Sequence, residues 1–423
     1  MPFKIAVVGT GYVGLTTGAC FAHLGHTVVC ADVDPAKIER LNRGDVPILE
    51  RGLDDIVHEC MADGRLTFVL GAAEAAKGAE FIYLCVPTPQ GSDGSADLSY
   101  IEVAAQQIGP VLTTDSIVVN KSTVPVGSTH VVERALQRND VHVVSNPEFL
   151  REGSAVHDFL NPDRIVIGAD NQAAAIRVAA LYSGIKAPLI VTDPSSAETI
   201  KYAANAFLAT KISFVNAVAA VCEAVGADIN DVVLGMGYDK RIGQEFLRPG
   251  PGWGGSCFPK DTKALVHIAE SAGYDFDLLR GVIAVNDRQL HRVVNKITAS
   301  CGGSLLGKTI AVWGLTFKAN TDDIRDSPAL AVIRRLITQG AMVKAYDPGI
   351  REQISGIENC QSAVEAATGA DVLTVLTEWD DFKWIDAGDV ATAMAGRHVV
   401  DARNLLDRNA YIRQGFTYLG IGR

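Results

Sequence analysis

The chain has 423 residues, of which 48% are hydrophobic and 21% are charged, and its formal net charge at pH 7 is −11. This composition excludes an intrinsically disordered chain, and the length predicts two or three domains. The acidic balance argues against a nucleic-acid partner, because binding to a phosphate backbone needs a surplus of basic residues.

The eight cysteines form no C-x-x-C pair, and Cys20, Cys30 and Cys85 lie in apolar runs typical of reduced core residues. The nine histidines lack the spacing of zinc ligands, so we expect no metal site. No apolar run approaches the roughly 18 residues of a membrane span, and no signal peptide precedes the first predicted strand. We therefore expect a cytoplasmic protein with no membrane partner.

The first predicted elements are a strand over residues 4–8, a helix to about His23 and a second strand in HTVVCADVD. Between the first strand and the helix lies G-x-G-x-x-G, formed by Gly9, Gly11 and Gly14. This order is typical of a dinucleotide-binding unit, in which the glycines admit a pyrophosphate at the helix N-terminus. Asp32 can accept hydrogen bonds from a ribose diol and would repel a 2′-phosphate, which favours NAD over NADP.

Strands then continue to alternate with helical patterns, in FIYLCVPTP (81–89), SIVVNKSTVPVGST (116–129), VHVVSNPEF (141–149) and RIVIG (164–168). Such alternation predicts a parallel sheet covered on both faces, with ligands at the carboxyl ends of its strands. Thr88, Thr123 and Glu148 each follow a strand and are expected at that edge.

From about Ser195 an alanine-rich helical pattern runs for some thirty residues, far longer than the average helix of about 11–12 residues. We expect this helix to connect two sheet domains and to form a dimer seam. Lys201 and Asn205 are four residues apart and share a face, where they could hold an alcohol or alkoxide oxygen. A polar stripe on a surface helix is the simpler alternative.

The stretch PGWGGSCFPKD (251–261) places Cys257 behind a run of glycines and before Pro259, which suits the first turn of a helix. A helix beginning near Ser256 would place the thiol at its positive end, which lowers a thiol pKa, and Lys260 adds a second cation. Asp261, four residues after the cysteine, would share its face. The pattern suits covalent chemistry on a carbonyl.

At residue 308 the first pattern starts again: KTIAVWGLTFK, a helix near SPALAVIRRLITQG and then AMVKAYDP. The second copy lacks the glycine fingerprint, and Gly314 to Asp347 spans 33 positions where Gly9 to Asp32 spans 23. It reads as a Rossmann-like domain adapted to another ligand. Lys318 and Arg325 in its loop are cations that can bind phosphates. The alternative is that the loop is a solvated charged segment.

We therefore predict an α/β protein in which two doubly wound, parallel-sheet, Rossmann-like domains are joined by a largely helical domain with one long helix. The predicted boundaries are 1–194 for the NAD-binding domain, 195–303 for the helical domain and 304–423 for the second sheet domain.

The chain as a whole resembles the nucleotide-sugar dehydrogenases of the UDP-glucose/GDP-mannose dehydrogenase family. The resemblance rests on GTGYVG (9–14), STVPVGST (122–129), NPEFLREG (146–153), KYAANAF (201–207), YDKRIG (238–243), GWGGSCFPKD (252–261) and FKANTDDIRDSP (317–328). Arg241 and the aromatic residue after the cysteine resemble the UDP-glucose enzymes more than the GDP-mannose enzymes. One departure is Trp253, where many relatives carry phenylalanine.

The resemblance implies NAD-dependent oxidation of UDP-glucose to UDP-glucuronate in two steps, through a thiohemiacetal and a thioester. Cys257 would be the nucleophile, Lys201, Asn205 and Asp261 would stabilise oxygen, and Glu148 and Thr123 would serve hydrolysis. The implied NAD contacts are Gly9, Gly11, Val13, Gly14, Asp32, Lys37, Thr88, Thr123, Glu152, Lys260 and Arg325. The implied contacts of the UDP-sugar substrate are Glu148, Phe149, Leu150, Lys201, Asn205, Phe246, Leu247, Arg248, Gly250, Gly252, Trp253, Gly254, Phe317, Lys318 and Arg403. Arg241 is expected to reach the neighbouring site of a homodimer or higher homo-oligomer.

Three alternatives stay open. The same chemistry could serve another nucleotide sugar, such as GDP-mannose or a UDP-N-acetyl-hexosamine. A single-step hydroxyacid dehydrogenase also sets a lysine and an asparagine on one helix, but it leaves Cys257 and the second sheet domain unexplained. An inactive NAD-sensing scaffold would be expected to lose the thiol or the lysine, and this chain has both.

Overall fold

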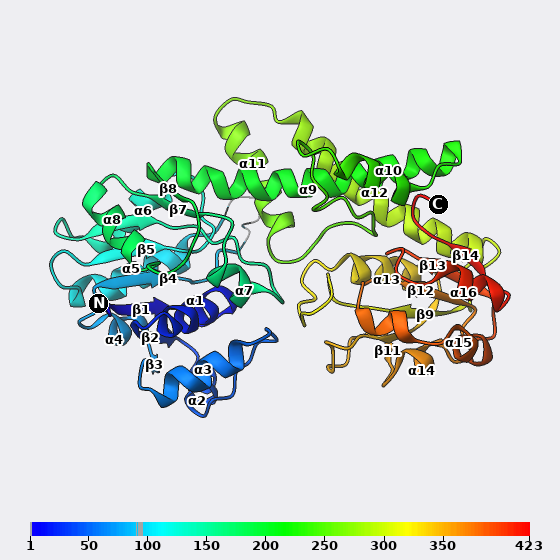
Figure 1. Cartoon of the computed structure of the whole chain (residues 1–423), viewed down its shortest axis with the longest axis horizontal. Helices are drawn as coiled ribbons and strands as arrows, with labels where there is room; N and C mark the ends of the chain where they lie inside the picture. Colours follow the sequence, from blue (N-terminus) through cyan, green and yellow to red (C-terminus); the bar gives the residue numbers. More distant parts are fainter. Residues whose placement is uncertain (1, 90, 92–95) are drawn as a thin grey trace. The chain divides into compact units, whose positions relative to one another are not determined.

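The computed structural model describes residues 2–89, 91 and 96–423. The chain divides into two compact units, one of Met1–Ala204 with Lys263–Ala272 and the other of Asn205–Thr262 with Gly273–Arg423. Each unit contains one sheet (Figure 1). The three-part boundaries stay a prediction.

The first sheet has eight strands in the order β3-β2-β1-β4-β5-β6-β7-β8. The strands are β1 Lys4–Val8, β2 Thr27–Asp32, β3 Leu66–Leu70, β4 Phe81–Leu84, β5 Ile117–Asn120, β6 His142–Ser145, β7 Ile165–Gly168 and β8 Leu189–Thr192. The accompanying helices are α1 Tyr12–His23, α2 Pro35–Asn42, α3 Leu53–Ala62, α4 Ala72–Ala76, α5 Ser99–Ile108, α6 Ser128–Leu136, α7 Ala155–Leu160 and α8 Gln172–Ala180, with the 3₁₀ turn η1 Gly109–Val111.

The parallel sheet predicted from the alternating pattern is confirmed from β3 to β6, but β7 pairs with β6 in the antiparallel direction. A connection between parallel strands has to cross from one end of the strands to the other, which takes about a dozen residues or more. The connection from β6 to β7, residues 146–164, contains the six-residue α7 and is long enough for such a crossover. The chain instead returns from the carboxyl end of β6, so β7 and β8 run opposite to the other strands.

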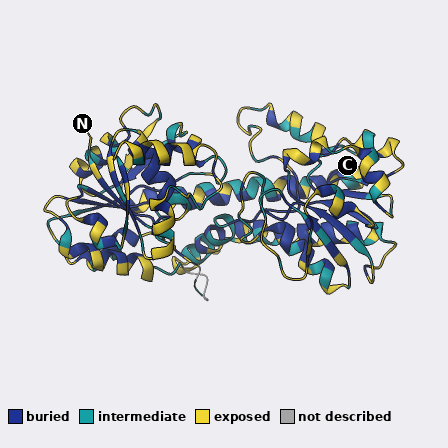
Figure 2. Cartoon of the chain, turned by 90° about the horizontal axis from the view of Figure 1, so that it is seen from below, coloured by how far each residue is buried: buried dark blue, intermediate teal, exposed yellow. Residues whose placement is uncertain are grey.

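The central strands of this sheet are buried on both faces, which explains their nearly unbroken apolar runs (Figure 2). Val7 and Tyr83 pack into one apolar cluster, and their neighbours Ala6 and Ile82 pack into another. Alternate side chains of one strand thus supply the two layers of core that support the carboxyl edge of the sheet.

Four further helices are α9 Pro194–Val225, α10 Ile229–Gly237, α11 Phe258–Ser271 and α12 Asp277–Ser300. The predicted long helix is confirmed, since α9 runs for 32 residues without interruption. The expectation that no stretch resembles a membrane span needs correction, because α9 is long and apolar enough to cross a membrane. Length and composition alone do not define a membrane span, since core helices of soluble proteins share them. Two of its polar residues, Glu198 and Glu223, bond to backbone amides elsewhere in their own units.

The second sheet has six parallel strands in the order β11-β10-β9-β12-β13-β14. Its strands are β9 Thr309–Trp313, β10 Met342–Tyr346, β11 Glu358–Asn359, β12 Val372–Val375, β13 His398–Asp401 and β14 Thr417–Leu419. Its helices are α13 Pro328–Thr338, α14 Ala363–Ala367, α15 Ala387–Ala393 and α16 Arg408–Arg413, with the 3₁₀ turn η2 Asp380–Trp384. The predicted repeat of strand, helix and strand after residue 308 is confirmed.

Candidate active site

The glycine turn after β1 is shaped by close backbone contacts. Gly9 has φ of +98°, and a Cβ on it would lie 2.6 Å from the carbonyl oxygen of Cys85. A Cβ on Gly14 would lie 1.8 Å from the carbonyl oxygen of Gly9. A Cβ on Gly11, which precedes the first residue of α1, would meet no atom within 4 Å. The turn therefore leaves open space at the helix N-terminus, where the pyrophosphate of a dinucleotide fits.

Asp32 ends β2 and is held from several sides. Its Oδ2 atom accepts hydrogen bonds from the backbone N–H and hydroxyl of Thr10, at 3.0 and 2.6 Å, and from Lys37 Nζ at 3.1 Å. Burial opposes ionisation, but these bonds together outweigh it and lower the pKa of Asp32 to about 2. Its contribution to stability is therefore present above the ordinary carboxyl pKa and is lost as the pH falls towards 2. The predicted NAD contact Lys37 is thus brought together with Asp32.

Replacing Asp32 by serine is expected to weaken NAD binding by about 10-fold, the cost of one charged hydrogen bond. The same change releases Lys37, so the preference for NAD over NADP is expected to narrow. Titration with each dinucleotide, followed by fluorescence, measures both effects. Glu39→Ser on α2, which removes an exposed carboxylate paired with Arg43, is the control. An Asp32→Ser protein with the control's affinities would refute this role.

Glu148 and Lys201 form a buried ion pair in the first unit, with Nζ 3.0 Å from Oε1 and side chains 5% and 4% exposed. Oε2 of Glu148 also accepts the backbone N–H of Leu150 at 2.7 Å. Lys201 lies 5.4 Å from the centre of the Phe149 ring, which also faces Arg164. The structure thus brings together four residues predicted for the substrate.

Thr88 and Thr123, which follow neighbouring strands, are also brought together. The hydroxyl of Thr88 donates to the carbonyl of Thr123 at 2.9 Å. Glu152 lies half-buried in the loop after β6.

Cys257 immediately precedes α11, as predicted, and its carbonyl accepts the N–H of Asp261 at 2.8 Å, the first bond of the helix. The thiol is partly exposed. Asp261 is completely buried and accepts hydrogen bonds from Asn205 at 2.6 Å and Lys260 at 2.7 Å. In the second unit the structure therefore gathers the thiol, a buried carboxylate and a cation at one helix start.

Residues predicted for the nucleotide also meet in the second unit. Arg403 donates to the carbonyls of Leu376 at 2.8 Å and Phe317 at 3.2 Å. A Cβ on Gly250 would lie 3.0 Å from a guanidinium nitrogen of Arg403. Lys318 lies 5.4 Å from the centre of the Phe317 ring.

Several predicted residues stand apart from these clusters. Arg241 has a side chain 89% exposed and pairs with Asp239, and Arg325 pairs with Asp323, each at 2.6 Å. Arg248 is exposed, whereas Leu247 is buried and Phe246 takes a positive φ of 62°.

Other polar residues that support these loops were not predicted. Glu198 on α9 accepts the backbone N–H groups of Gly127 and Thr129, at 2.6 and 3.1 Å, and so holds the loop that carries Thr123. Asp401 accepts the N–H of Arg403 at 2.9 Å and the hydroxyl of Tyr418 at 2.6 Å. An acid directly after the apolar residues of a predicted strand, in HVVD (398–401), is the signal that could have pointed to Asp401.

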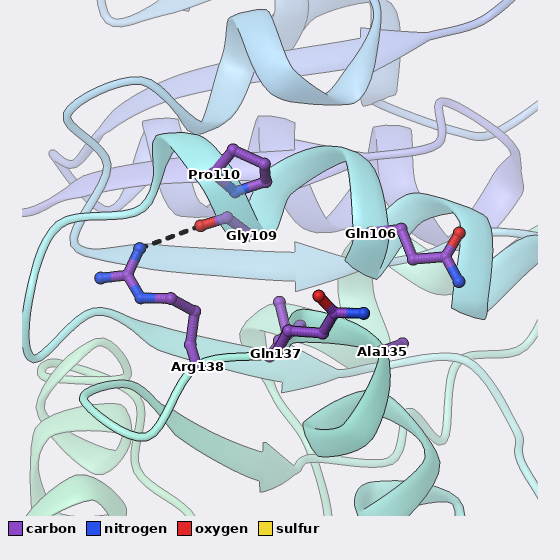
Figure 3. Close-up of a pocket in the computed structure, with 7 residues that line it drawn as sticks. Gln106, Gly109, Pro110, Ala135, Gln137 and Arg138 are labelled. Carbon is purple, nitrogen blue, oxygen red and sulfur yellow. Dashed lines mark hydrogen bonds between the residues drawn. The ribbon is translucent and has the colours of Figure 1, made fainter.

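A separate pocket of about 410 Å³ lies beside the end of α5 (Figure 3). It is lined by Gln106, Gly109, Pro110, Ala135, Leu136, Gln137 and Arg138. Arg138 donates to the carbonyl of Gly109 there. None of these residues was predicted for the site.

Three models of the UDP-glucose/GDP-mannose dehydrogenase family match the chain: the NAD binding domain over residues 3–186, the central domain over 195–288 and the UDP binding domain over 311–408. A UDP-glucose 6-dehydrogenase of Bacillus subtilis, TuaD, is 47% identical over 99% of this chain and 93% of the relative. The solved UDP-glucose dehydrogenase of Pyrobaculum islandicum is 37% identical, covers 100% of this chain and 98% of its own, and gives a TM-score of 0.92. A UDP-D-ManNAc dehydrogenase of Pyrococcus horikoshii is 29% identical, covers 99% of both chains and gives 0.90.

Proposed function

Because the chain belongs to the UDP-glucose/GDP-mannose dehydrogenase family, we propose that it oxidises UDP-glucose twice, to UDP-glucuronate, with NAD as the oxidant. The observation that supports this best is Cys257 at the start of α11, one turn before the buried Asp261. One oxidation of an alcohol needs no thiol. A second oxidation, to the acid, gains a route through a covalent thiohemiacetal.

The first oxidation converts the C6 alcohol to an aldehyde. NAD, when bound, accepts one hydride in each of the two oxidations. Lys201 and Asn205, one helical turn apart on α9, hold the C6 oxygen as the hydride leaves, and the hydroxyl proton passes to water. The ammonium of Lys201 stabilises the negative charge that develops on this oxygen.

The thiolate of Cys257 then adds to the aldehyde carbon and forms a carbon–sulfur bond, and the former aldehyde oxygen takes a proton from water to give a thiohemiacetal. The N-terminus of α11 and the nearby Lys260 favour the thiolate over the thiol. Loss of a second hydride from the same carbon, and of the hydroxyl proton, leaves a thioester.

Hydrolysis completes the cycle. Glu148 takes a proton from a water held with Thr123, and the resulting hydroxide adds to the thioester carbon. The carbon–sulfur bond breaks, the thiolate leaves and the carboxylate product is released. The backbone N–H of Leu150 fixes the second oxygen of Glu148 for this role.

A stoichiometric assay tests the proposal. Exhaustive conversion of limiting UDP-glucose is expected to give two NADH per sugar, whereas one NADH with an aldehyde or ketone product would favour a single-step dehydrogenase. The similarity to the Pyrococcus enzyme makes a UDP-N-acetyl-hexosamine the second candidate, so the assay includes UDP-N-acetylmannosamine, UDP-N-acetylglucosamine and GDP-mannose. NAD binding without NADH formation from any of these sugars would indicate the inactive scaffold.

We also propose that two copies associate along α9. Phe207, Phe214, Val221 and Val225 are exposed and recur at intervals of seven, seven and four residues, which places them on one stripe of the helix. An exposed apolar stripe of this kind marks an interface. Arg241, exposed in the single chain, would then reach the neighbouring site.

Replacing Phe214 by aspartate is expected to convert the dimer to a monomer, because the new charge would be buried without a partner. Sedimentation at micromolar concentration measures the state, with Asn295→Asp at an exposed position of α12 as the control. A wild-type chain that sediments as a monomer would refute the proposed association along α9.

We further propose a cytoplasmic location, in keeping with eight described cysteines that form no disulfide.

A further inference from the structure

The backbone between Gly250 and Trp253 is held by side-chain amides. The N–H of Gly250 donates to Asn216 Oδ1, and the carbonyl of Gly250 accepts from Gln289 Nε2, both at 2.8 Å. The N–H of Trp253 donates to Asn286 Oδ1 at 2.8 Å, and its carbonyl accepts from Asn286 Nδ2 at 3.0 Å. Both polar groups of both residues are therefore satisfied by amide side chains.

These three amides, the amide clamp, come from two helices and are buried. Asn216 lies on α9, and Asn286 and Gln289 lie one turn apart on α12. Their side chains belong to residues 1%, 8% and 3% exposed. Buried backbone groups are normally paired within helices or sheets, and an irregular segment has to find partners elsewhere. The amide clamp supplies both donors and acceptors without burying a charge.

The segment is fitted closely to the amide clamp. Gly252 has φ of +134°, and a Cβ on it would lie 2.8 Å from Asn286 Oδ1. The indole N–H of Trp253 donates to Ser213 at 2.8 Å, and the Ser213 hydroxyl donates to the carbonyl of Val282. Backbone and side chain are thus fixed to the same two helices, α9 and α12.

The fixed segment lies between two predicted parts of the site. Gly250 packs against the guanidinium of Arg403, and Cys257 follows Trp253 by four residues. A shift of this segment would therefore change both the surface offered to the nucleotide and the approach to the thiol. A displacement of about 1 Å is enough to cost about 100-fold in rate.

We propose that Asn216, Asn286 and Gln289 are positioning residues, which set the affinity for the UDP-sugar by fixing the loop from Gly250 to Trp253. This inference rests on the proposed function for its substrate. The amide clamp itself acts through the backbone of the loop, and none of its three amides needs to contact the sugar.

Gln289 gives the sharpest test, because its amide acts as a donor to the carbonyl of Gly250. Gln289→Met removes the donor, and Gln289→Glu replaces it with a group that donates only when protonated. We expect each variant to raise the KM for UDP-glucose by about 10-fold at neutral pH, with the KM for NAD changed less than about twofold. As the pH is lowered, the defect of Gln289→Glu relative to wild type is expected to shrink, while that of Gln289→Met stays constant. Asn295→Leu, an exposed change on α12, is the control.

Binding of UDP alone, measured by calorimetry, tests the amide clamp independently of the proposed oxidation of UDP-glucose. The Kd for UDP is expected to rise in both Gln289 variants even if UDP-glucose is not the substrate. Asn216 supplies a second comparison, since Asn216→Asp keeps the acceptor for Gly250 and Asn216→Leu removes it. The proposal is overturned if Gln289→Met binds UDP like the control. It is also overturned if the KM values for both substrates rise together, or if Gln289→Glu and Gln289→Met share one pH profile.

Discussion

Replacing Cys257 by serine is expected to abolish formation of UDP-glucuronate, with kcat reduced by at least about 10³-fold, because serine is a far weaker nucleophile at neutral pH than a thiolate. The first hydride transfer does not need the sulfur. The variant is therefore expected to release at most one NADH per sugar, or to retain the sugar as an ester that hydrolyses slowly. NADH and products are measured together in a single-turnover experiment.

Cys301→Ser is the matched control for this experiment, because Cys301 is also partly exposed but lies at the end of α12. It is expected to behave as the wild type. A Cys257→Ser protein that produces two NADH per sugar at the control's rate would show that the sulfur is not needed.

Replacing Lys201 by methionine is expected to lower both activity and stability. The change leaves the buried carboxylate of Glu148 without its ammonium, which costs about 3–5 kcal/mol of unfolding free energy for a buried pair. Loss of the charge that stabilises the oxyanion is expected to reduce kcat by about 10²–10³-fold. Urea denaturation and initial rates measure the two effects separately.

The double variant Lys201→Met/Glu148→Gln distinguishes the two roles. It is expected to regain most of the lost stability, because no unpaired charge remains buried, but to stay slow in the first hydride transfer, a step that does not use Glu148. Lys211→Met on the same helix, where the ammonium bonds to the carbonyl of Ile242, is the control. If the double variant regained the rate of the first hydride transfer as well, Lys201 would have only a structural role.

Elements with a local signal were predicted well. The turn at Gly9, the helix to His23 and the acid at the end of β2 follow one another within a few dozen residues, so periodicity and glycine spacing were sufficient to predict them. The long helix α9 and the start of α11 beside Cys257 were predicted on the same basis. The family resemblance drawn from the motifs is also confirmed by the three matching models.

Features that depend on distant contacts were not predicted. The antiparallel direction of β7 depends on the path of the chain after β6. The apolar run RIVIG predicts a strand but does not show whether that strand runs parallel or antiparallel to its neighbour. The repeat correctly placed Asp347 at the end of β10, but there the Trp379 indole and the Thr316 amide N–H donate to its carboxylate, which is buried. Asp347 therefore fixes a loop of the protein, whereas Asp32, its counterpart in the first sheet, is expected to bind a ribose.

The predicted site residues are a mixed case. Glu148 and Lys201 are 53 residues apart, and no spacing rule joins them, so only the resemblance linked them before the structure placed them 3.0 Å apart. The three residues of the amide clamp gave no signal, because a buried asparagine or glutamine looks the same in sequence as an exposed one.

The most direct test of the account is the mass of the enzyme during turnover. Glu148→Gln, in which hydrolysis is expected to be slow, is mixed with UDP-glucose and excess NAD, quenched with acid and digested. We expect two NADH per sugar to be released in the first turnover and a UDP-glucuronyl adduct on the peptide that contains Cys257. Release of two NADH with that peptide unmodified, or with the adduct on another residue, would contradict covalent catalysis by Cys257.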